Sequence, residues 1–593
     1  MPSTSTPRGA RSHYQVEVAD LHAHLFRITL RIDAPTVSQQ VSLPVWIPGS
    51  YLVREFSKNL QHLNAHQDGH ALAVVQLDKC NWQIECAIGK PLVLSYEVYA
   101  FDNSVRTAWL DAQRGFFNGT SLCLRVHGQE QAAHGLELTP VKGMAHWEAA
   151  CALPAHRVGK RGFGTYLAAD YDELVDCPVE MGAFWSGQFK AGGVPHRLVV
   201  SGAGESFDHA RLLADVQKIC ETEIRFWHER KRPPHKHYLF MLNVVDDGYG
   251  GLEHRNCTAL IATRRDLPRL HDTASSPAVP RQQEGYNTLL GLISHESFHT
   301  WTIKRLRPAE FTSYDYAHEN YTGLLWFFEG FTSYYDDLML RRAGLIDEAT
   351  YLKLLNKTIN QVLQTPGRLV QPVAQASFDA WVKYYRQDEN TPNATVSYYT
   401  KGALVALCLD LSLRAEGHST LDDVMRALWL RCKAGPMSEA DFAQALKELG
   451  GRSYSREITN WIHGTRDLPL KDLLGKVGIE VIEEPAQMQQ RLGLRISEHQ
   501  GIHIKTVLRG GAAEQAGMAA QDEWLGVEVA GVGWRLNKLD ELPLYAGQHT
   551  KITALVARDK RLLRLTLGLP SVNTWRLVLR DATRAQPWLA GIA

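Results

Sequence analysis

The first part of the chain alternates between apolar and polar residues. Residues 26–32 alternate strictly, and residues 94–98 repeat the pattern. Successive side chains of a strand point to opposite faces, so each run predicts a strand with one buried face. Turn-forming stretches such as residues 46–51 separate these runs. We therefore predict an N-terminal antiparallel β-sheet domain over residues 1–165.

A helical pattern replaces this alternation in the middle of the chain. Strand-like runs at residues 198–201 and 238–245 are accompanied by apolar residues at helical spacing, over residues 210–229 and 287–304. Helical patterns then dominate almost to the end of this region. We predict a mainly helical domain on a small sheet, over residues 166–475.

Short alternating runs return near the end of the chain, at residues 502–505 and 563–567. They predict a third, small and mostly β domain over residues 476–593. A chain of 593 residues is long enough for several separate cores. The fold class predicted from these patterns is multidomain α+β.

The composition is that of an ordinary globular protein and does not favour nucleic acid or a membrane as a partner. The 64 Lys and Arg residues balance 64 Asp and Glu residues. The chain has no run of ~18 apolar residues, and its start lacks the apolar core of a secretory signal. Nine dispersed cysteines without a Cys-x-x-Cys pair suit a reducing compartment. We predict a cytoplasmic protein.

The strongest chemical signal is the sequence His-Glu-x-x-His at residues 295–299. On a helix, His295 and His299 lie ~40° apart around the axis and project from one face. Two such imidazoles suit Zn²⁺, whose tetrahedral shell then has room for a third ligand and a water. Glu296 lies close enough to that water to act as general base. Coincidence is the alternative, because roughly one chain in twenty with this histidine content contains the pattern by chance.

Glu329 is the candidate for the third metal ligand. It stands alone among apolar and aromatic neighbours in Leu-Trp-Phe-Phe-Glu-Gly-Phe-Thr. Burying an unpaired carboxylate costs several kcal/mol, so this residue needs a metal, a cation or a set of donors. A helix-terminal carboxylate or a salt bridge is the alternative. Glu319 is a rival ligand, although its polar surroundings resemble a surface loop.

His-Glu-x-x-His followed by Glu-Gly-Phe-Thr resembles the gluzincin aminopeptidases, and most closely the glycyl aminopeptidase family of PDZ-containing zinc metallopeptidases. The similarity extends to residues 46–56, 176–182, 491–495 and 510–517. It implies a thermolysin-like catalytic domain, a PDZ-like domain at the C-terminus and one Zn²⁺ per chain. The wider clan places its glutamate nearer the second histidine than Glu329 is, and Glu319 fits that shorter spacing better.

The resemblance also implies substrate-binding residues. Gly250, Gly251 and Glu253 lie in Gly-Gly-Leu-Glu-His, which looks like the Gly-x-Met-Glu-Asn loop whose glutamate holds the substrate's α-amino group. Leu and His replace Met and Asn, which leaves a glycine-rich turn with a solvated Glu as the alternative. Glu180 is a further candidate for binding the amine.

Tyr399 is the candidate for stabilising the oxyanion of the transition state. It stands where the related enzymes have a Tyr-x-Lys-Gly segment whose phenol donates to the oxyanion. A donor of this type contributes ~2.7 to 4 kcal/mol. Tyr398 is the neighbouring alternative, and ordinary packing is another.

The function predicted from the resemblance is a zinc aminopeptidase that removes small N-terminal residues, Gly or Ala, from peptides with a free N-terminus. A zinc endopeptidase or oligopeptidase without an amine anchor is one alternative. A non-catalytic PDZ scaffold that binds peptides is another. The PDZ-like domain is predicted either to bind a peptide C-terminus or only to pack against the peptidase.

Overall fold

The computed structural model describes residues 10–270 and 279–591. Residues 1–9, where we predict no signal segment, lie outside this part. The chain divides into two compact units, one made of Met1–Asn320 with Ala434–Pro436 and the other of Tyr321–Lys433 with Met437–Ala593. The multidomain α+β organisation predicted from the sequence is confirmed, with β-sheets in the N-terminal part and helices in the middle.

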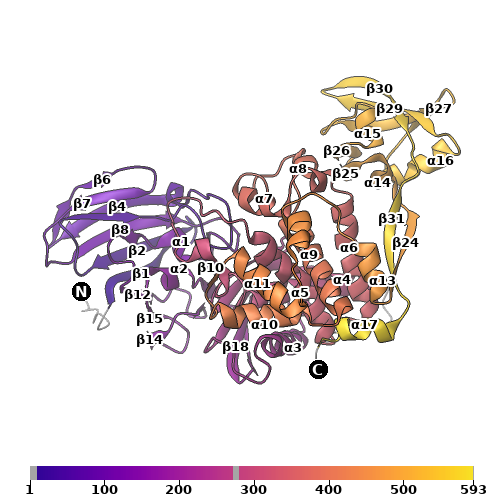
Figure 1. Cartoon of the computed structure of the whole chain (residues 1–593). Coiled ribbons are helices and arrows are strands. Elements are labelled where there is room, and N and C mark those ends of the chain that lie inside the picture. The colour runs from indigo at the N-terminus through magenta and orange to yellow at the C-terminus, as the bar shows by residue number, and fades with distance from the viewer. Residues whose placement is uncertain (1–9, 271–278, 592–593) are drawn as a thin grey trace. The chain divides into compact units, whose positions relative to one another are not determined.

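An eight-stranded sheet dominates the N-terminal part of the first unit (Figure 1). Phe26, Ile28, Leu30 and Ile32 are fully buried, as their alternation predicts. All neighbouring strands are antiparallel except β1 and β12, which run parallel. The strand order is β14 (Ala155–Val158), β15 (Gly164–Ala168), β12 (Ala133–Leu138), β1 (Ala10–Asp20), β2 (Leu25–Ile32), β8 (Leu92–Tyr99), β4 (Leu60–Gln67) and β5 (His70–Leu72).

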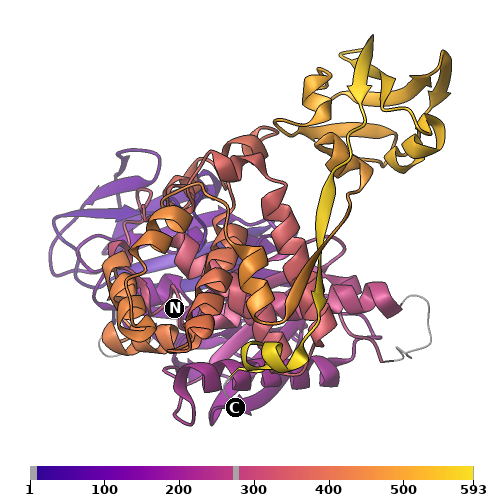
Figure 2. The same cartoon turned by 45° about the vertical axis from the view of Figure 1, so that its right-hand side comes forward.

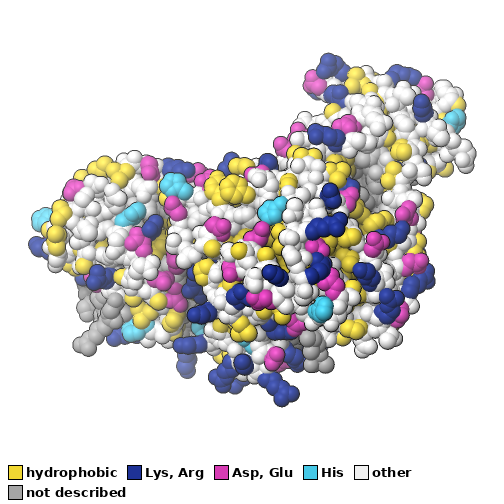
Figure 3. Space-filling view, in the orientation of Figure 1, with side chains coloured by type: hydrophobic (Ala, Val, Ile, Leu, Met, Phe, Trp, Pro, Cys, Tyr) yellow, Lys and Arg dark blue, Asp and Glu magenta, His cyan; other side chains and the backbone are white. Residues whose placement is uncertain are grey.

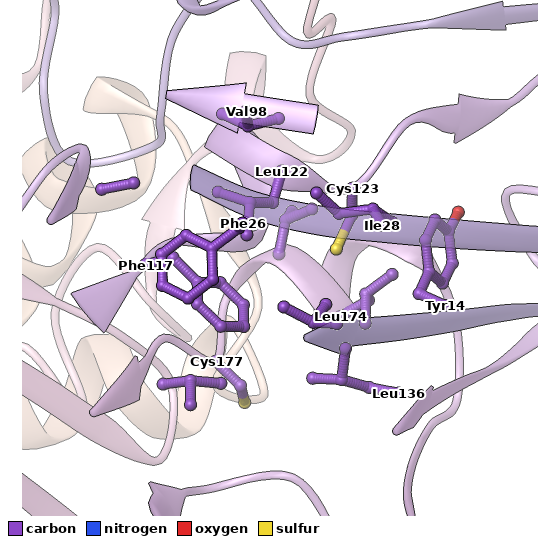
Figure 4. Close-up of a cluster of buried hydrophobic side chains, with 14 of the residues drawn as sticks. Tyr14, Phe26, Ile28, Val98, Phe117, Leu122, Cys123, Leu136, Leu174 and Cys177 are labelled. Carbon is purple, nitrogen blue, oxygen red and sulfur yellow. The ribbon is translucent and has the colours of Figure 1, made fainter. Parts of the chain in front are cut away.

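Two four-stranded sheets complete the N-terminal part. One has the order β13 (Glu148–Cys151), β16 (Val179–Gly182), β10 (Arg114–Phe117) and β9 (Ala108–Leu110), and the other has β11 (Arg125–Val126), β3 (Ser38–Ser42), β7 (Asn81–Glu85) and β6 (Val74–Gln76). The short helices α1 (Gly119–Leu122) and α2 (Tyr171–Val175) lie between strands in the sequence. Figure 4 shows side chains from these elements packed together, among them Phe26, Phe117 and Leu174.

A five-stranded sheet follows in the same unit. Its order is β17 (Trp185–Ala191), β18 (Val194–Ser201), β19 (Tyr238–Val245), β21 (Cys257–Thr263) and β20 (Gly250–Glu253). The three central strands are parallel, and the two edge strands β17 and β20 are antiparallel to their neighbours. The strand-like runs expected at residues 198–201 and 238–245 therefore form central strands of this sheet.

Helices α3 (His209–His228) and α4 (Val279–Phe298) pack against each other, and α4 also contacts β20 and β21. Helix α4 ends earlier than the predicted range of 287–304, because the chain turns at residues 299–300 and Ile303 takes a left-handed φ of 61°. His299 thus stands just beyond the helix, although its N–H still points to the carbonyl of His295 at 3.4 Å.

The N-terminal sheets and the five-stranded sheet share one hydrophobic core. Leu239, Met241 and Leu252 of the five-stranded sheet belong to the same cluster of buried side chains as Tyr14 and Phe26. Buried side chains from both sides of residue 165 thus belong to one cluster, and residues up to Asn320 lie in one compact unit. The division into three domains stays a prediction.

The second unit begins with a group of helices, and α5 and α9 pack along each other at its centre. The helices are α5 (Leu325–Arg342), α6 (Glu348–Leu363), α7 (Val373–Phe378), α8 (Thr391–Ala394), α9 (Tyr398–Glu416), α10 (Leu421–Arg431), α11 (Glu439–Gly450) and α13 (Leu470–Lys476). Helix α9 is buried for most of its length. This burial explains why its sequence is apolar on every face of the helix.

A six-stranded sheet with a core of its own forms the last part of the second unit. Its path is β25 (Leu494–Ser497), β26 (Ile502–Val507), β27 (Glu523–Val529), β29 (Lys551–Arg558) and β30 (Arg561–Gly568), and β28 (Val532–Arg535) pairs with β27. The long ribbon of β24 (Ile479–Pro485) and β31 (Asn573–Leu579) leads to and from it, and α17 (Ala582–Leu589) follows (Figure 2).

Charged side chains of both signs are interspersed on the face drawn in Figure 3, in keeping with the balanced charge of the sequence. All nine cysteines are free thiols. Within residues 10–270 and 279–591, none of the helices has both the length and the apolar character needed to cross a bilayer.

Candidate functional site

Helix α4 is held in a fixed rotation by a buried carboxylate on α3. Glu223 accepts hydrogen bonds from Ser294 Oγ, at 3.2 Å, and from Ser297 Oγ. Because residues advance ~100° per position around a helix, these serines face away from the side that carries His295 and His299. The bonds to α3 therefore set the direction in which the two imidazoles project.

The imidazoles of His295 and His299 converge on one point. Their Nε2 atoms lie 3.1 Å apart, and the ring planes are inclined by 84°. A tetrahedral zinc ion bound ~2.0 to 2.1 Å from each nitrogen would hold them ~3.3 Å apart, which is close to the spacing found. The other nitrogen of His299, Nδ1, lies 3.3 Å from Thr302 Oγ1, a contact that orients the ring.

Glu296 lies directly against the edge strand β20. A Cβ atom placed on Gly251 would stand 2.1 Å from Glu296 Oε1, so any other residue at this position would displace the carboxylate. This close approach explains the second glycine of the Gly-Gly-Leu-Glu sequence. Glu296 is buried, with 6% of its surface exposed, and it lies at the strand edge beside the two histidines.

Strand β20 points Glu253 toward the same side. Alternate residues of a strand share a face, so Glu253 lies on the same face of β20 as Gly251. This is the face that contacts Glu296. Leu252, between them, points to the opposite face and into the core. Glu253 is 4% exposed, and its Oε1 has no hydrogen-bond partner among the described residues. A buried carboxylate oxygen without a donor requires one, and an ammonium group would supply it.

Gly49, from the N-terminal part of the unit, covers the Glu253 carboxylate. A Cβ on Gly49 would lie 2.4 Å from Glu253 Oε1, and the residue has a φ of +97°, a conformation that favours glycine. It belongs to residues 46–56, the segment that carries part of the family resemblance. That segment thus forms one wall of the Glu253 site.

The turn that follows Glu253 is fixed by a buried ion cluster around Asp176. Asp176 accepts from the Arg255 N–H at 2.8 Å and contacts His254 Nδ1 and Lys304 Nζ, each at 3.2 Å. Burial alone would raise the pKa of Asp176, but Lys304, His254 and Arg255 outweigh it and hold that pKa far below its usual range. His254, which replaces the asparagine of the wider clan, is therefore bound to this cluster.

Glu180 is already bound on both of its oxygens. Arg114 donates to them through Nε at 2.7 Å and Nη2 at 2.8 Å, and Ser201 Oγ donates at 2.5 Å. These contacts do not favour an additional amine at Glu180.

In the second unit, two glycines bring helices α5 and α9 into close contact. A Cβ on Gly330 would lie 2.5 Å from the Cα of Gly402 and 2.8 Å from the carbonyl oxygen of Tyr398. Gly330 follows Glu329 directly, and Gly402 lies three residues after Tyr399. The glycines of both sequence motifs therefore serve the same helix crossing.

This crossing places Glu329 close to Tyr399. Burial, and after it the Glu329 carboxylate, raises the pKa of Tyr399 well above its usual value, so the phenol stays protonated and able to donate. Tyr398 stacks on Tyr399 with ring centroids 4.7 Å apart and is fully buried. Tyr399 is only half-buried, and its hydroxyl lies 3.4 Å from that of Tyr385.

One group of side chains among the described residues has donor atoms suited to a metal ion. It consists of His295, His299 and Glu329, whose ligand atoms all lie within 4.8 Å of one another. Two imidazole nitrogens and one carboxylate oxygen are a donor set that zinc accepts at a catalytic site, where a water fills the fourth position. Glu319 is not part of the group.

Two residues that contact β20 were not predicted from the sequence. Gly49 could be noticed in the sequence only because residues 46–56 share the family resemblance. Arg106, which donates from Nη2 to the carbonyl of Gly251 at 2.9 Å, had none, because a single arginine between two strands has no distinctive pattern.

Two family models match the chain. Residues 13–183 match the Peptidase M61 N-terminal domain, and residues 288–405 match M61 glycyl aminopeptidase. Among solved structures, an aminopeptidase N family protein from Idiomarina loihiensis is 35% identical, with a TM-score of 0.91, over 98% of this chain and 100% of that chain. No curated protein gives a match.

Two more distant solved structures also match the chain. An M1 zinc metallopeptidase from Deinococcus radiodurans is 14% identical, with a TM-score of 0.46, over 78% of this chain and 96% of its own. Legionella pneumophila aminopeptidase A in complex with aspartic acid is 11% identical, with a TM-score of 0.49, over 96% of this chain and 58% of its own.

Proposed function

The chain belongs to the M61 glycyl aminopeptidase family and is a metallopeptidase, and from this premise we propose that it is a zinc aminopeptidase. It removes one small residue, Gly or Ala, at a time from the free N-terminus of a peptide. The observation that carries the proposal is the convergence of His295 and His299 beside Glu296, with the Glu253 carboxylate buried on the same side of β20.

We propose that His295, His299 and Glu329 hold one Zn²⁺ per chain. When bound, the ion supplies Lewis acidity, which acidifies water and polarises a carbonyl group. Glu296 accepts the proton of the attacking water and returns it to the leaving amine. The protonated Tyr399 phenol donates a hydrogen bond to the developing oxyanion.

Glu253 makes the reaction specific for the N-terminal residue. Its unpartnered carboxylate oxygen receives the α-ammonium group of the substrate, and this charge-assisted contact fixes which peptide bond reaches Glu296. Gly49 lies against this carboxylate, so the backbone at residue 49 bounds the site beyond Glu253. An active site that recognises the free N-terminus in this way cleaves the first peptide bond, which is the activity of an exopeptidase.

Hydrolysis of Ala-p-nitroanilide and of its N-acetylated form tests the aminopeptidase directly. We expect release of p-nitroaniline from the free amine only, and we expect Glu253→Gln to lose much of the rate on it. Cleavage of the acetylated form at a similar rate would instead favour the zinc endopeptidase. Absence of any peptidase activity in metal-loaded protein would favour the peptide-binding scaffold.

For the six-stranded part of the second unit we propose a PDZ-like fold. The Gly-Ala-rich segment at residues 510–517, the edge strand β25 and the short helix α16 (Leu542–Ala546) support it. Asn393 binds the Val507 carbonyl at 2.9 Å and the Arg509 N–H at 2.8 Å, which supports a packing role. Binding of a peptide C-terminus at β25 is the other proposed role.

A further inference from the structure

The outer edge of β20 is closed at one point by an arginine from the N-terminal part of the first unit. Strand β20 pairs with β21 on one side only, so its other side is a sheet edge to which an extended peptide can pair. The Gly251 carbonyl faces this edge and accepts a hydrogen bond from Arg106 Nη2 at 2.9 Å. Arg106 therefore lies where a peptide on β20 would pass.

The direction of such a peptide follows from Glu253. If Glu253 binds the N-terminal ammonium, a peptide antiparallel to β20 runs from Glu253 toward Gly250, so its second residue lies beside Leu252 and the group that follows lies beside Gly251. Two residues along a strand span ~6.8 Å. An extended dipeptide has nearly the same length, ~7 Å at most. Its carboxylate would therefore reach the position of Arg106.

The charge of Arg106 has no counter-ion among the described residues. The ion pairs among the described residues include none with Arg106, and its Nε is buried without a hydrogen-bond partner. The bond to Gly251 holds the guanidinium in place and leaves other N–H groups for a ligand. A planar guanidinium fork is suited to binding a carboxylate through two parallel hydrogen bonds.

Building on the proposed aminopeptidase function, we propose that Arg106 binds the C-terminal carboxylate of dipeptide substrates. Glu253 and Arg106 then form a pair of opposite charges that matches the two ends of a dipeptide zwitterion. Free dipeptides are the preferred substrate class, and peptides that continue beyond the second residue lose the contact. Arg106 is thus a residue that determines specificity for substrate length.

The test compares Ala-Ala with Ala-Ala-amide in the same enzyme near pH 7.5. For the wild type we expect kcat/KM to be ~10-fold to 100-fold higher for the free acid, the range of a hydrogen bond to a charged group. In Arg106→Gln this ratio should approach one, and in Arg106→Lys it should be intermediate, because the charge remains but the fork is lost. A ratio within one enzyme cancels any general loss of active protein.

Two controls sharpen the comparison. Arg27→Gln removes an exposed arginine of β2 that pairs with Glu97. This variant should keep the wild-type ratio of kcat/KM for Ala-Ala to kcat/KM for Ala-Ala-amide. In the wild type, kcat/KM should be nearly the same for Ala-Ala-Ala and Ala-Ala-Ala-amide. The carboxylate of the tripeptide lies ~3.4 Å further along the strand than that of the dipeptide, beyond Arg106.

Each outcome separates this inference from the proposed function. Equal wild-type rates on Ala-Ala and Ala-Ala-amide would overturn the role of Arg106 and leave the aminopeptidase intact. An unchanged ratio in Arg106→Gln would do the same. Failure to cleave Ala-Ala, Ala-Ala-amide and Ala-p-nitroanilide alike would instead refute the proposed function.

Discussion

Glu296 and Gly251 depend on each other, because the space that the carboxylate occupies is available only beside a glycine. The two residues are 45 positions apart (296 − 251) and come from a helix and a strand. The spacing of His-Glu-x-x-His was enough to identify His295, Glu296 and His299 as candidates. Their contact with Gly251 depends on the fold and could be suspected only through the family resemblance.

Replacing Glu296 with Gln should abolish turnover while metal binding persists. The amide keeps the size of the side chain but cannot accept the proton of the attacking water, so we expect kcat to fall by ~100-fold or more. Steady-state kinetics and metal analysis of the same preparation measure both effects. Wild-type kcat in Glu296→Gln would show that another residue is the base.

Gly251→Ala should reduce activity through the position of Glu296. The added methyl group would lie 2.1 Å from Glu296 Oε1 and must displace the carboxylate, and a displacement of ~1 Å costs ~100-fold in rate. Gly204→Ala is the matched control, because a Cβ there meets nothing within 4 Å. Equal kcat/KM in the two variants would contradict the assigned contact.

At the scale of elements, the runs named from the sequence pattern correspond to strands and helices, but their limits differ. The alternation at residues 26–32 corresponds to β2, and the helical spacing at 210–229 corresponds closely to α3. Helix α4 begins and ends earlier than its apolar pattern suggests, and its end coincides with a turn at residues 299–300. The crossing of α5 and α9 had no signal beyond two glycines in separate motifs.

That crossing predicts a loss of stability in Gly402→Ala. The new Cβ would lie 2.4 Å from the carbonyl oxygen of Trp326 and 2.9 Å from the Cα of Gly330, so the helices must separate. Overpacking of this kind costs ~1 to 3 kcal/mol in the free energy of unfolding. Urea denaturation measures it.

Gly475→Ala, in helix α13, is the control for this experiment. A Cβ at Gly475 meets nothing within 4 Å, so the substitution should be neutral or stabilise the helix by ~1 kcal/mol. Equal unfolding midpoints for the two variants would show that α5 and α9 do not need the glycine contact.

For the whole molecule, three domains were predicted, and the contacts divide the chain into two compact units. The predicted boundary near residue 165 precedes three further strands, β16 to β18, and buried side chains from both sides of it belong to one core. A pattern of local hydrophobicity cannot reveal that two sheets share a core, since the contacts join residues far apart in the sequence. The Asp176 cluster is another such long-range link.

Asp176→Asn should destabilise the first unit, because it removes the carboxylate that pairs with the buried Lys304 ammonium at 3.2 Å. Removal of one partner of a buried ion pair typically costs ~3 to 5 kcal/mol. Burial alone would lower the pKa of Lys304, but Asp176 raises it above its usual value, so the ammonium stays charged. Thermal unfolding near pH 7 measures the change.

The pH dependence of this effect has a definite sign. The pKa of Asp176 is lowered in the folded state, so its contribution is present above the unfolded-state value of ~3.9 and is lost as the pH falls below it. The difference in stability between wild type and Asp176→Asn should therefore shrink in acid. The exposed pair of Asp246 and Arg265 provides the control, and Asp246→Asn should change stability by ~0 to 1 kcal/mol at most.

The central claim is one zinc ion per chain, bound by His295, His299 and Glu329 and required for peptide cleavage. Elemental analysis of dialysed protein, with Ala-p-nitroanilide assays before and after chelation, tests it most directly. We expect one zinc per chain in the wild type and in Glu296→Gln, very little in Glu329→Ala, and activity that disappears with the metal and returns with added Zn²⁺. Wild-type protein that cleaves the substrate at full rate without any bound transition metal would contradict the account.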